Sequence, residues 1–471
     1  MKQEYIDRFR TIILWAIFAG ILILLFFHTY NKTFSHDEFE HIHTAWKILQ
    51  GQEIYVDFFQ HHHPFLDYLL VPIIYIFGDT TTSIFVSSYL MLLMVGGILT
   101  VTYFLALRLF KNSEIGLISL ILTSTVVAFY GKSITVRPDA PQALAGLLSI
   151  YFLFVYYDNK SVKNLITSAI FLAVSFLFLQ KAIALIIPIG ILFLYDLYGK
   201  RLKMKEVLLY AGVFLLTISP YYIYLLINGS LEKYFVLNWI LNMHIRETQG
   251  LSKYSIMMEI LRENTITCML YVVGVITLLR SNINRQFVVL SLCSVITVLL
   301  LYNNLWKQYF VFTVPPIAIV ASYALYTVFK SNVSKFILII FAIYTPLSMM
   351  HDYGSIIRNR GFVNEYRTNQ LEKMDYVLSI TDQNDKVYDG NIHINLYRDD
   401  IDYFWFCLAP NDCLDAYKKI AGYKYDIYEL ISVHKPKVIN TFNIENLADD
   451  RIKNYYKPSE KFEDILIRVE E

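Results

Sequence analysis

The chain has 471 residues, of which 56% are hydrophobic and 17% charged, and its mean hydropathy is +0.43. A composition this apolar excludes an ordinary soluble globular protein and indicates a membrane protein with many spans. The net charge of +1 is unevenly distributed along the chain, because the part from Asp352 to the end carries 22 acidic and 16 basic residues. We therefore predict a transmembrane domain over 1–351 and a small, negatively charged soluble domain over 352–471.

Apolar runs predict the membrane spans, since about 20 residues are needed to cross roughly 30 Å of hydrocarbon. We place eleven spans, near residues 11–29, 83–107, 114–130, 139–157, 164–180, 182–198, 207–227, 260–279, 287–302, 310–329 and 335–351. Several of these runs are short or adjoin a neighbour, so nine to thirteen spans are compatible with the sequence.

The lysines and arginines of the short loops predict the orientation, because positively charged short loops resist translocation. With a cytoplasmic N-terminus, every inner segment holds at least two of them, whereas the short outer turns carry few, namely Lys132, Arg137, Lys181 and Lys307. An odd number of spans then places the C-terminal domain outside, on the same side as the long first loop, 30–82. The first apolar run is long and no small-residue cleavage site follows it, so we expect an anchor rather than a signal peptide.

The stretch Ser35-His36-Asp37-Glu38 has the form of a capping box at the start of a helix. The helix should end near Gly51, and its apolar residues recur at helical spacing, which predicts an amphipathic helix along the membrane interface. Glu38 then has a structural interpretation as part of the cap. Asp37 is not needed for the box, and it either complements the helix dipole or takes part in chemistry.

Seven of the eleven histidines lie in or beside the first outer loop, at positions 28, 36, 41, 43 and 61–63. Histidines and carboxylates together are compatible with a metal site. However, three consecutive histidines cannot all point the same way, and the chain has no H-E-x-x-H spacing. We therefore favour hydrogen bonding to a substrate, with His63 as one candidate, over a metal site.

The segment HDEFEHIHTAWKILQGQEIYVDFFQHHHPFLDYLL resembles the first outer loop of the GT-C glycosyltransferases, specifically the superfamily of dolichyl-phosphate-mannose protein mannosyltransferases and aminoarabinose transferases. The matching features are an acidic pair, a Gly, a Tyr-x-Asp and a His-Pro, here Asp37-Glu38, Gly51, Tyr55-x-Asp57 and His63-Pro64. Three further fragments match in the same order: VRPDAPQALAGLL, FLFLQKAIALIIPIG and WKQYFVFTVPPIAI. The hairpin fragment has Gln180-Lys181-Ala182 where Thr-Lys-Gly is commoner in the family.

The resemblance implies a transferase that moves a sugar from a polyprenyl phosphate to an acceptor hydroxyl with inversion, without a soluble nucleotide sugar. It implies Asp37 as the catalytic base, with Glu38 beside it, near the bilayer surface where a lipid presents the anomeric carbon. The departing phosphate needs positive charge on the same side, for which Arg137, Lys181 and Lys307 are the candidates. Their alternative role is to extend toward lipid headgroups.

The residues His63, Asp139, Gln308 and Tyr309 are the candidates for binding the sugar or the acceptor. Asp139 has the alternative of pairing with Arg137, and Tyr309 that of anchoring a span at the interface. No metal site and no required cofactor are expected, although a divalent metal is a possibility that we do not favour.

The C-terminal region predicts a small α/β domain, because helix-like and strand-like segments alternate in it. The expected order is a helix in EYRTNQLEKMDYVLSI, a strand at KVYDG, the aromatic run IDYFWFCL, a helix in DIYELISVH and a strand at KPKVINTF. No dinucleotide-binding fingerprint is present, and we expect this domain to shape or gate the acceptor side.

The prediction as a whole is a GT-C transferase, a hexosyl or pentosyl transferase in the bilayer of a bacterial plasma membrane. Its partners are a polyprenyl-phosphate sugar donor and an extracytoplasmic acceptor on a protein, lipid or surface glycan, and not nucleic acid. The main alternative is a transporter or flippase of a lipid-linked glycan, which would need ionisable residues through mid-membrane; the predicted spans hold few of them. A metal-sensing receptor is a third alternative and rests on the histidines alone.

Overall fold

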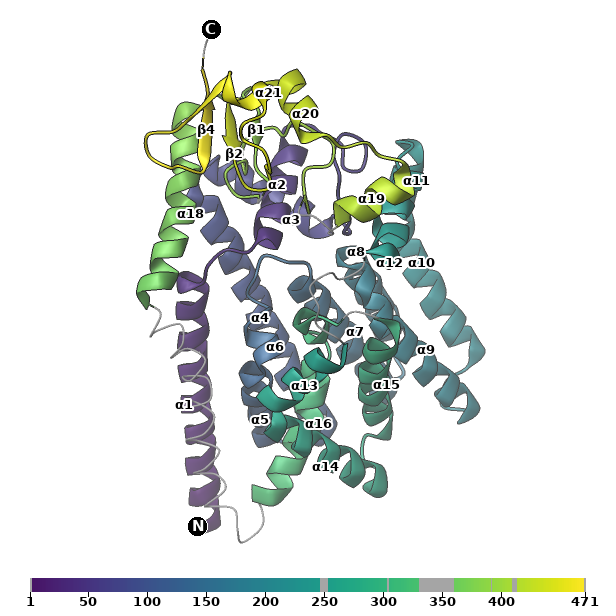
Figure 1. The fold of residues 1–471 in the computed structure, drawn as a ribbon. Coiled ribbons are helices and arrows are strands. Elements are labelled where there is room, and N and C mark those ends of the chain that lie inside the picture. Colours follow the sequence, from purple (N-terminus) through teal and green to yellow (C-terminus); the bar gives the residue numbers. More distant parts are fainter. Residues whose placement is uncertain are drawn as a thin grey trace. The chain divides into compact units, whose positions relative to one another are not determined.

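The structure is a computed structural model, and it describes residues 2–245, 253–302, 305–329, 360–390, 392–408 and 413–469 (Figure 1). The chain divides into two compact units. The first comprises Met1–Asn31, Tyr89–Pro220 and Leu251–Arg360, and the second comprises Lys32–Ser88, Tyr221–Gly250 and Gly361–Glu471. The C-terminal residues thus share a unit with the first loop, and the domain boundary near residue 351 stays a prediction.

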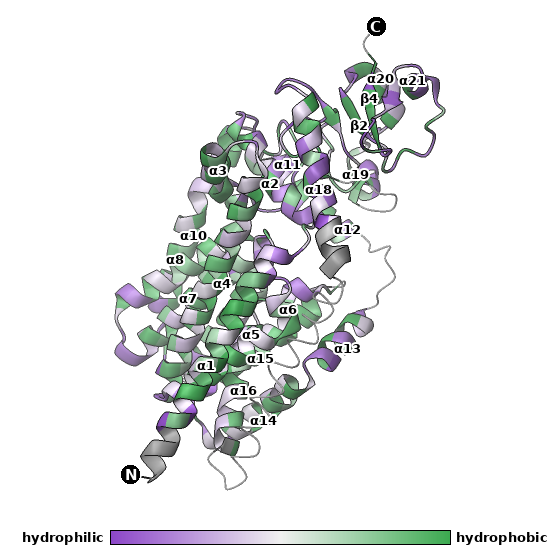
Figure 2. Cartoon of the chain, turned by 90° about the vertical axis from the view of Figure 1, so that its left-hand side faces the viewer, coloured by the Kyte–Doolittle hydropathy of each residue, from purple (hydrophilic) through white to green (hydrophobic). Residues whose placement is uncertain are grey.

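The first unit is helical. Its elements are α1 (Lys2–Asn31), α5 (Ser113–Thr125), α6 (Val127–Tyr130), α7 (Asp139–Asn159), α8 (Val162–Phe178), the 3₁₀ turn η1 (Gln180–Ala182), α9 (Ile183–Tyr198), α13 (Lys253–Glu263), α14 (Thr265–Ser281), α15 (Arg285–Leu301), the 3₁₀ turn η3 (Lys307–Phe310) and α16 (Val314–Phe329). Most of α4 (Thr81–Phe110) and α10 (Met204–Ile227) also belongs to it. Figure 2 shows that hydrophobic residues predominate along most of these helices, with α13 an exception, whereas α18 of the second unit (Arg360–Ile380) is largely hydrophilic.

Five helices of the described chain are long and apolar enough to cross a membrane: α1 from Arg8 onward, α4, α7, the run Gln180–Tyr198 and α10. The pair α13 and α14 makes a sixth if it is one span, but it is bent by 89°. The helices α3 (Phe65–Phe77), α5, α8, α15 and α16 are apolar and shorter. Ten of the eleven predicted spans coincide with helices, and the run 335–351 lies outside the described residues. The protein is a multi-pass membrane protein, while the count of eleven spans stays a prediction.

Close helix packing in the first unit depends on a glycine. A Cβ atom on Gly274 of α14 would lie 2.3 Å from the carbonyl oxygen of Val320 in α16, so only glycine allows the two backbones to approach this closely. Small residues at such contacts are typical of helix pairs in membranes, where burial away from water gives no drive for association.

The second unit begins with α2 (His36–Leu49) and α3 (Phe65–Phe77) of the first loop. It continues with α11 (Leu231–Phe235), the π-helix η2 (Val236–Leu241) and α12 (Asn242–His244). The C-terminal part supplies α18, β1 (Val387–Tyr388), α19 (Cys413–Ala421), α20 (Ile427–His434), β2 (Val438–Asn440), α21 (Asp450–Lys453), β3 (Tyr456–Pro458) and β4 (Ile465–Arg468).

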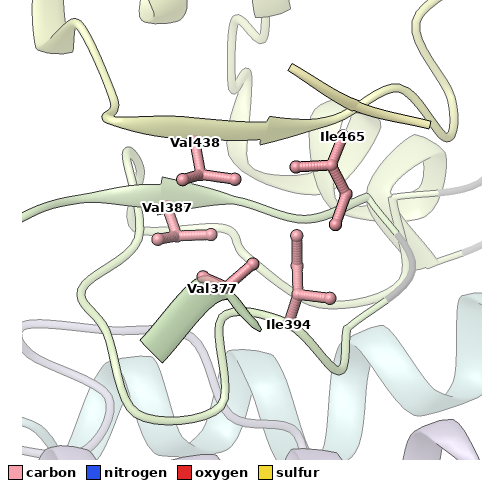
Figure 3. Close-up of a cluster of buried hydrophobic side chains, with 5 residues drawn as sticks. All are labelled: Val377, Val387, Ile394, Val438 and Ile465. Carbon is pink, nitrogen blue, oxygen red and sulfur yellow. The ribbon is translucent and has the colours of Figure 1, made fainter. Parts of the chain in front are cut away.

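The four strands form one sheet in the order β1-β2-β4-β3. β1 and β2 are parallel, with Val387 opposite Val438, whereas β4 is antiparallel to both of its neighbours. Figure 3 shows Val387, Val438 and Ile465 of the sheet meeting Val377 of α18 and Ile394, and all five side chains are fully buried. This apolar cluster holds the helix against the sheet.

The predicted elements of the C-terminal region are found at α18, β1, α20 and β2. The aromatic run 401–408 is neither helix nor strand, although most of it is buried. It packs instead on the first loop, where the backbone N–H of Phe59 donates to the Tyr403 carbonyl at 3.0 Å and the Trp405 indole donates to the Phe59 carbonyl at 2.9 Å. These contacts satisfy backbone groups without a regular ladder.

Candidate active site

The predicted capping box is present at the start of α2. Ser35 is the N-cap, and its backbone N–H donates to Glu38 Oε2 at 3.0 Å. Glu38 is fully buried and also forms an ion pair with Lys32. Burial lowers the pKa of Lys32, and the Glu38 carboxylate opposes that shift. Glu38 therefore holds the beginning of the helix, which favours the structural interpretation of this residue.

Asp37 lies in the first turn of the same helix and is half-buried. A helix N-terminus favours negative charge, because its backbone N–H groups point toward it. The side chain is thus placed at the beginning of a helix and keeps partial access to the surroundings. That combination suits a base that must meet an incoming hydroxyl.

The helix α2 is buried on its polar face as well as on its apolar face. All ten residues from Glu38 to Lys47 are buried, and six of them carry polar or ionisable side chains. The polar groups find internal partners instead: His43 Nε2 lies 2.9 Å from Asp400 Oδ2, and Lys47 Nζ lies 2.7 Å from the same carboxylate. The polar face of α2 is therefore covered by protein, while the position of the helix along the membrane interface stays a prediction; the predicted bounds are correct to within two residues.

The Tyr-x-Asp motif shapes the turn after α2. Tyr55 has a φ of 67°, a left-handed conformation that costs a non-glycine residue free energy, and its fully buried hydroxyl donates to the His62 carbonyl at 2.7 Å. Asp57 accepts the backbone N–H of Glu53 at 2.6 Å. The motif thereby sets the path of the loop that leads to the three histidines.

His63 is 1% exposed, and its Nε2 lies 2.7 Å from the hydroxyl of Tyr234 in α11. This hydrogen bond fixes the plane of the imidazole ring. Its role in sugar or acceptor binding stays a prediction.

A second group of histidines surrounds a carboxylate. Glu40, His41 and His62 each offer a ligand atom, and these atoms all lie within 4.8 Å of one another. His41 Nδ1 lies 2.6 Å from Asp67 Oδ1 of α3. Among the described residues this is the group that has the composition and spacing to hold a metal ion.

The remaining predicted residues lie in the first unit. Arg137 donates from Nε to Asp139 Oδ2 at 3.1 Å, and both side chains are buried. Asp139 begins α7 directly after Pro138, as the sequence predicts. The pairing expected as an alternative role of Asp139 is therefore present.

Lys181 lies in η1, the tight turn that joins α8 to α9, as the sequence predicts. Its Nζ is 4.0 Å from the centre of the Tyr309 ring, and its carbonyl accepts the Tyr302 hydroxyl at 3.1 Å. The rings of Tyr302 and Tyr309 lie 4.7 Å apart. Lys181 and Tyr309, 128 positions apart in sequence, are thus brought together, with the half-buried Gln308 adjacent in η3.

Lys307 is differently placed, because Nζ lies 2.8 Å from Glu259 and 2.7 Å from Glu263 of α13. Burial works against its charge, but hydrogen bonds to the two carboxylates outweigh it and raise the pKa of Lys307. Its charge is already balanced by protein carboxylates, which makes it a weaker candidate for a phosphate than Lys181.

Comparison with known proteins gives a consistent result. Residues 61–224 match the model of the dolichyl-phosphate-mannose-protein mannosyltransferase family, whereas no curated protein matches the chain. Among solved structures, ArnT from Cupriavidus metallidurans bound to undecaprenyl phosphate has 12% sequence identity and a TM-score of 0.58, covering 86% of this chain and 88% of ArnT.

The oligosaccharyltransferase AglB from Archaeoglobus fulgidus, in complex with an inhibitory peptide and a dolichol-phosphate, has 12% identity and a TM-score of 0.59. That alignment covers 92% of this chain and 69% of AglB. At these identities the likeness shows the fold. The resemblance read from the motifs is confirmed, and the chain is a multi-pass membrane protein with the fold of the GT-C glycosyltransferases.

Proposed function

We propose that this protein is a membrane glycosyltransferase that moves a sugar from a polyprenyl-phosphate donor to an acceptor hydroxyl outside the cytoplasm, with inversion. The observation that carries the proposal is the fold shared with two structures that hold polyprenyl phosphates, undecaprenyl phosphate in ArnT and a dolichol-phosphate in AglB. The family match over residues 61–224 supports the same reaction class. The C-terminal region then lies on the acceptor side, and the membrane is a bacterial plasma membrane.

In the proposed reaction, the acceptor oxygen attacks the anomeric carbon on the face opposite the phosphate. A carbon–oxygen bond forms there as the bond to the phosphate oxygen breaks, and polyprenyl phosphate leaves with the electron pair. Asp37 takes the hydroxyl proton, a transfer that occurs late because the hydroxyl becomes acidic as it bonds to the electron-poor carbon. Neither a metal nor a cofactor is required for this step.

The leaving phosphate needs cations, and Lys181 is the one we assign first, with Arg137 and Lys307 as further candidates. The Tyr309 ring beside Lys181 restricts the lysine side chain, which reduces the entropy lost when it binds a phosphate. Gln308, Tyr309, Asp139 and His63 are proposed to bind the sugar or the acceptor.

The proposed function is tested with the purified full-length protein and a panel of labelled polyprenyl-phosphate hexoses and pentoses, with crude membranes as acceptor. We expect protein-dependent transfer of label from at least one lipid, with release of polyprenyl phosphate, and a product of inverted anomeric configuration by NMR. Absence of turnover with every donor, combined with protein-dependent movement of a labelled glycolipid across liposomes, would replace the transferase with the transporter alternative.

Substitution of Lys181 by Gln is expected to reduce kcat/KM for the donor by roughly 10- to 100-fold, because a hydrogen bond to a charged group contributes about 1.5–3 kcal/mol. The matched substitution Lys307→Gln should change it less than about threefold, since Glu259 and Glu263 already engage that ammonium. Steady-state kinetics with varied donor measure both. Equal losses in the two variants would contradict the assignment of Lys181.

A further inference from the structure

The cluster of Glu40, His41 and His62 has a composition that the proposed transfer does not use. Glu40 and His41 are each 1% exposed and His62 is 9% exposed. Two imidazoles and one carboxylate are a donor set that first-row divalent cations prefer, Zn²⁺ above all, with a fourth position left for water. We propose that these three residues bind a divalent transition-metal ion of the Zn²⁺ class.

Geometry supports the site. The three ligand atoms lie within 4.8 Å of one another. Tetrahedral bonds of about 2.0–2.1 Å hold ligand atoms about 3.4 Å apart. Rotation of the side chains can close this difference, because the Glu40 side chain has three rotatable bonds and each imidazole side chain has two.

Asp67 supplies the outer contact that metal-binding histidines require. Its Oδ1 lies 2.6 Å from His41 Nδ1, and its side chain is fully buried. A carboxylate that accepts the proton of Nδ1 fixes the tautomer of the ring and directs Nε2 to the metal, and such contacts commonly tune metal affinity by 10- to 100-fold. The pair comes from two helices, α2 and α3, which gives the ligand a rigid support.

The loop that carries His62 is also fixed before any metal binds. The backbone N–H groups of His61 and His62 both donate to Gln60 Oε1, at 2.7 and 3.0 Å, and the amide of Gln60 donates to Thr44 of α2 at 3.1 Å. The His62 carbonyl accepts the Tyr55 hydroxyl. The ligands from α2 and from the loop are therefore held near one another by contacts independent of the metal.

The buried negative charge of Glu40 also favours a bound cation. A carboxylate that is 1% exposed is costly to bury unless positive charge lies close to it. Glu40 Oε1 lies 3.5 Å from Nδ1 of His61, an imidazole that is charged only when protonated. A divalent ion would balance the carboxylate at neutral pH, and it would fasten the loop to α2 one turn beyond Asp37. The function of the ion is then to position the helix that carries Asp37, not to take part in transfer.

The test uses the full-length protein without a polyhistidine tag, stripped with a chelator and titrated with Co²⁺ alone. We expect about one Co²⁺ per chain, the visible absorption of a four-coordinate ion, and its displacement by Zn²⁺. The substitutions Glu40→Gln and His62→Gln should each abolish the absorption, and Asp67→Asn should weaken binding by about 10- to 100-fold. His244→Gln changes an exposed histidine on α12 and serves as the matched control, with unchanged binding expected.

Two results would overturn the proposal: wild-type protein that binds no Co²⁺, or binding that persists unchanged in the Glu40→Gln and His62→Gln variants. If the variants fail to elute as single species in gel filtration, X-ray absorption spectroscopy of the zinc-loaded wild type tests the site by counting the imidazole ligands of the metal. Two imidazoles in the coordination shell support the site, and fewer than two exclude it. None of these readouts depends on sugar transfer, so the proposed function and the metal site can fail separately.

Discussion

Asp37→Asn is expected to reduce sugar transfer by at least about a hundredfold while leaving the protein folded. A positioned general base contributes typically 10²- to 10⁴-fold, and the amide keeps the size of the carboxylate but cannot accept the hydroxyl proton. Because Asp37 is not part of the capping box, its replacement should leave the N-terminus of α2 intact. Initial rates with a saturating labelled donor, together with thermal unfolding in detergent, measure the two effects.

Two neighbours of Asp37 serve as controls. His36 is exposed in the same turn, and His36→Gln should retain both turnover and stability. Glu38→Gln should instead lower the unfolding temperature, because it removes the partner of a buried lysine. Wild-type turnover in Asp37→Asn would remove this residue as the base, and equal unfolding losses in Asp37→Asn and Glu38→Gln would indicate a structural role for both.

Sequence reasoning succeeded where the signal is local. Caps, apolar runs and tight turns are set by residues a few positions apart, and so α2, α7 and the turn at Lys181 are found where the sequence predicts them. The capping function of Glu38 was visible for the same reason, since Ser35 and Glu38 are three positions apart.

Contacts between distant segments could not be predicted in this way. His43 and Asp400 are separated by 357 positions, and nothing in the periodicity of α2 indicates that its polar face is covered by the C-terminal region. For that reason the sequence predicts only an amphipathic helix along the membrane interface. The aromatic run 401–408 was equally ambiguous, because it forms no regular element of its own and packs on the distant first loop and on α19.

The cluster of Glu40, His41 and His62 lies between these two cases, because it was predictable in composition but not in geometry. The composition of the first loop is compatible with a metal site, although the sequence favoured hydrogen bonding to a substrate, and the path of the loop between α2 and α3 decides which histidines meet. Of the three consecutive histidines, His62 joins His41 and Glu40, whereas His63 bonds to Tyr234. The left-handed Tyr55 that directs this path is not a residue type from which such a conformation is predicted. The three neighbouring histidines do not all point the same way, as the sequence predicts. The candidate metal site uses only one of them, His62.

Asp400→Asn is expected to lower the stability of the second unit by about 3–5 kcal/mol, because removing one partner of a buried ion pair leaves the others uncompensated. Asp400 is 7% exposed and is contacted by His43 at 2.9 Å, Lys47 at 2.7 Å and the amide of Asn395 at 2.7 Å. The variant should therefore unfold roughly 5–15 °C below wild type in detergent, as measured by intrinsic fluorescence.

The neighbouring Asp399 provides the control, because its side chain is 40% exposed and lies 3.7 Å from Lys47. Asp399→Asn should lower the stability by less than about 1 kcal/mol, as is typical of exposed ion pairs.

The stability contribution of Asp400 should also depend on pH. Burial opposes ionisation of Asp400, but Lys47 and then His43 outweigh it and lower its pKa to about 2. A carboxyl with a depressed folded-state pKa stabilises the protein above the pKa of the unfolded chain, and this contribution is lost as the pH falls from about 4 to about 2. The difference in unfolding temperature between wild type and Asp400→Asn should accordingly shrink over that range, and a difference that stays constant would show that the contacts of Asp400 do not depend on its charge.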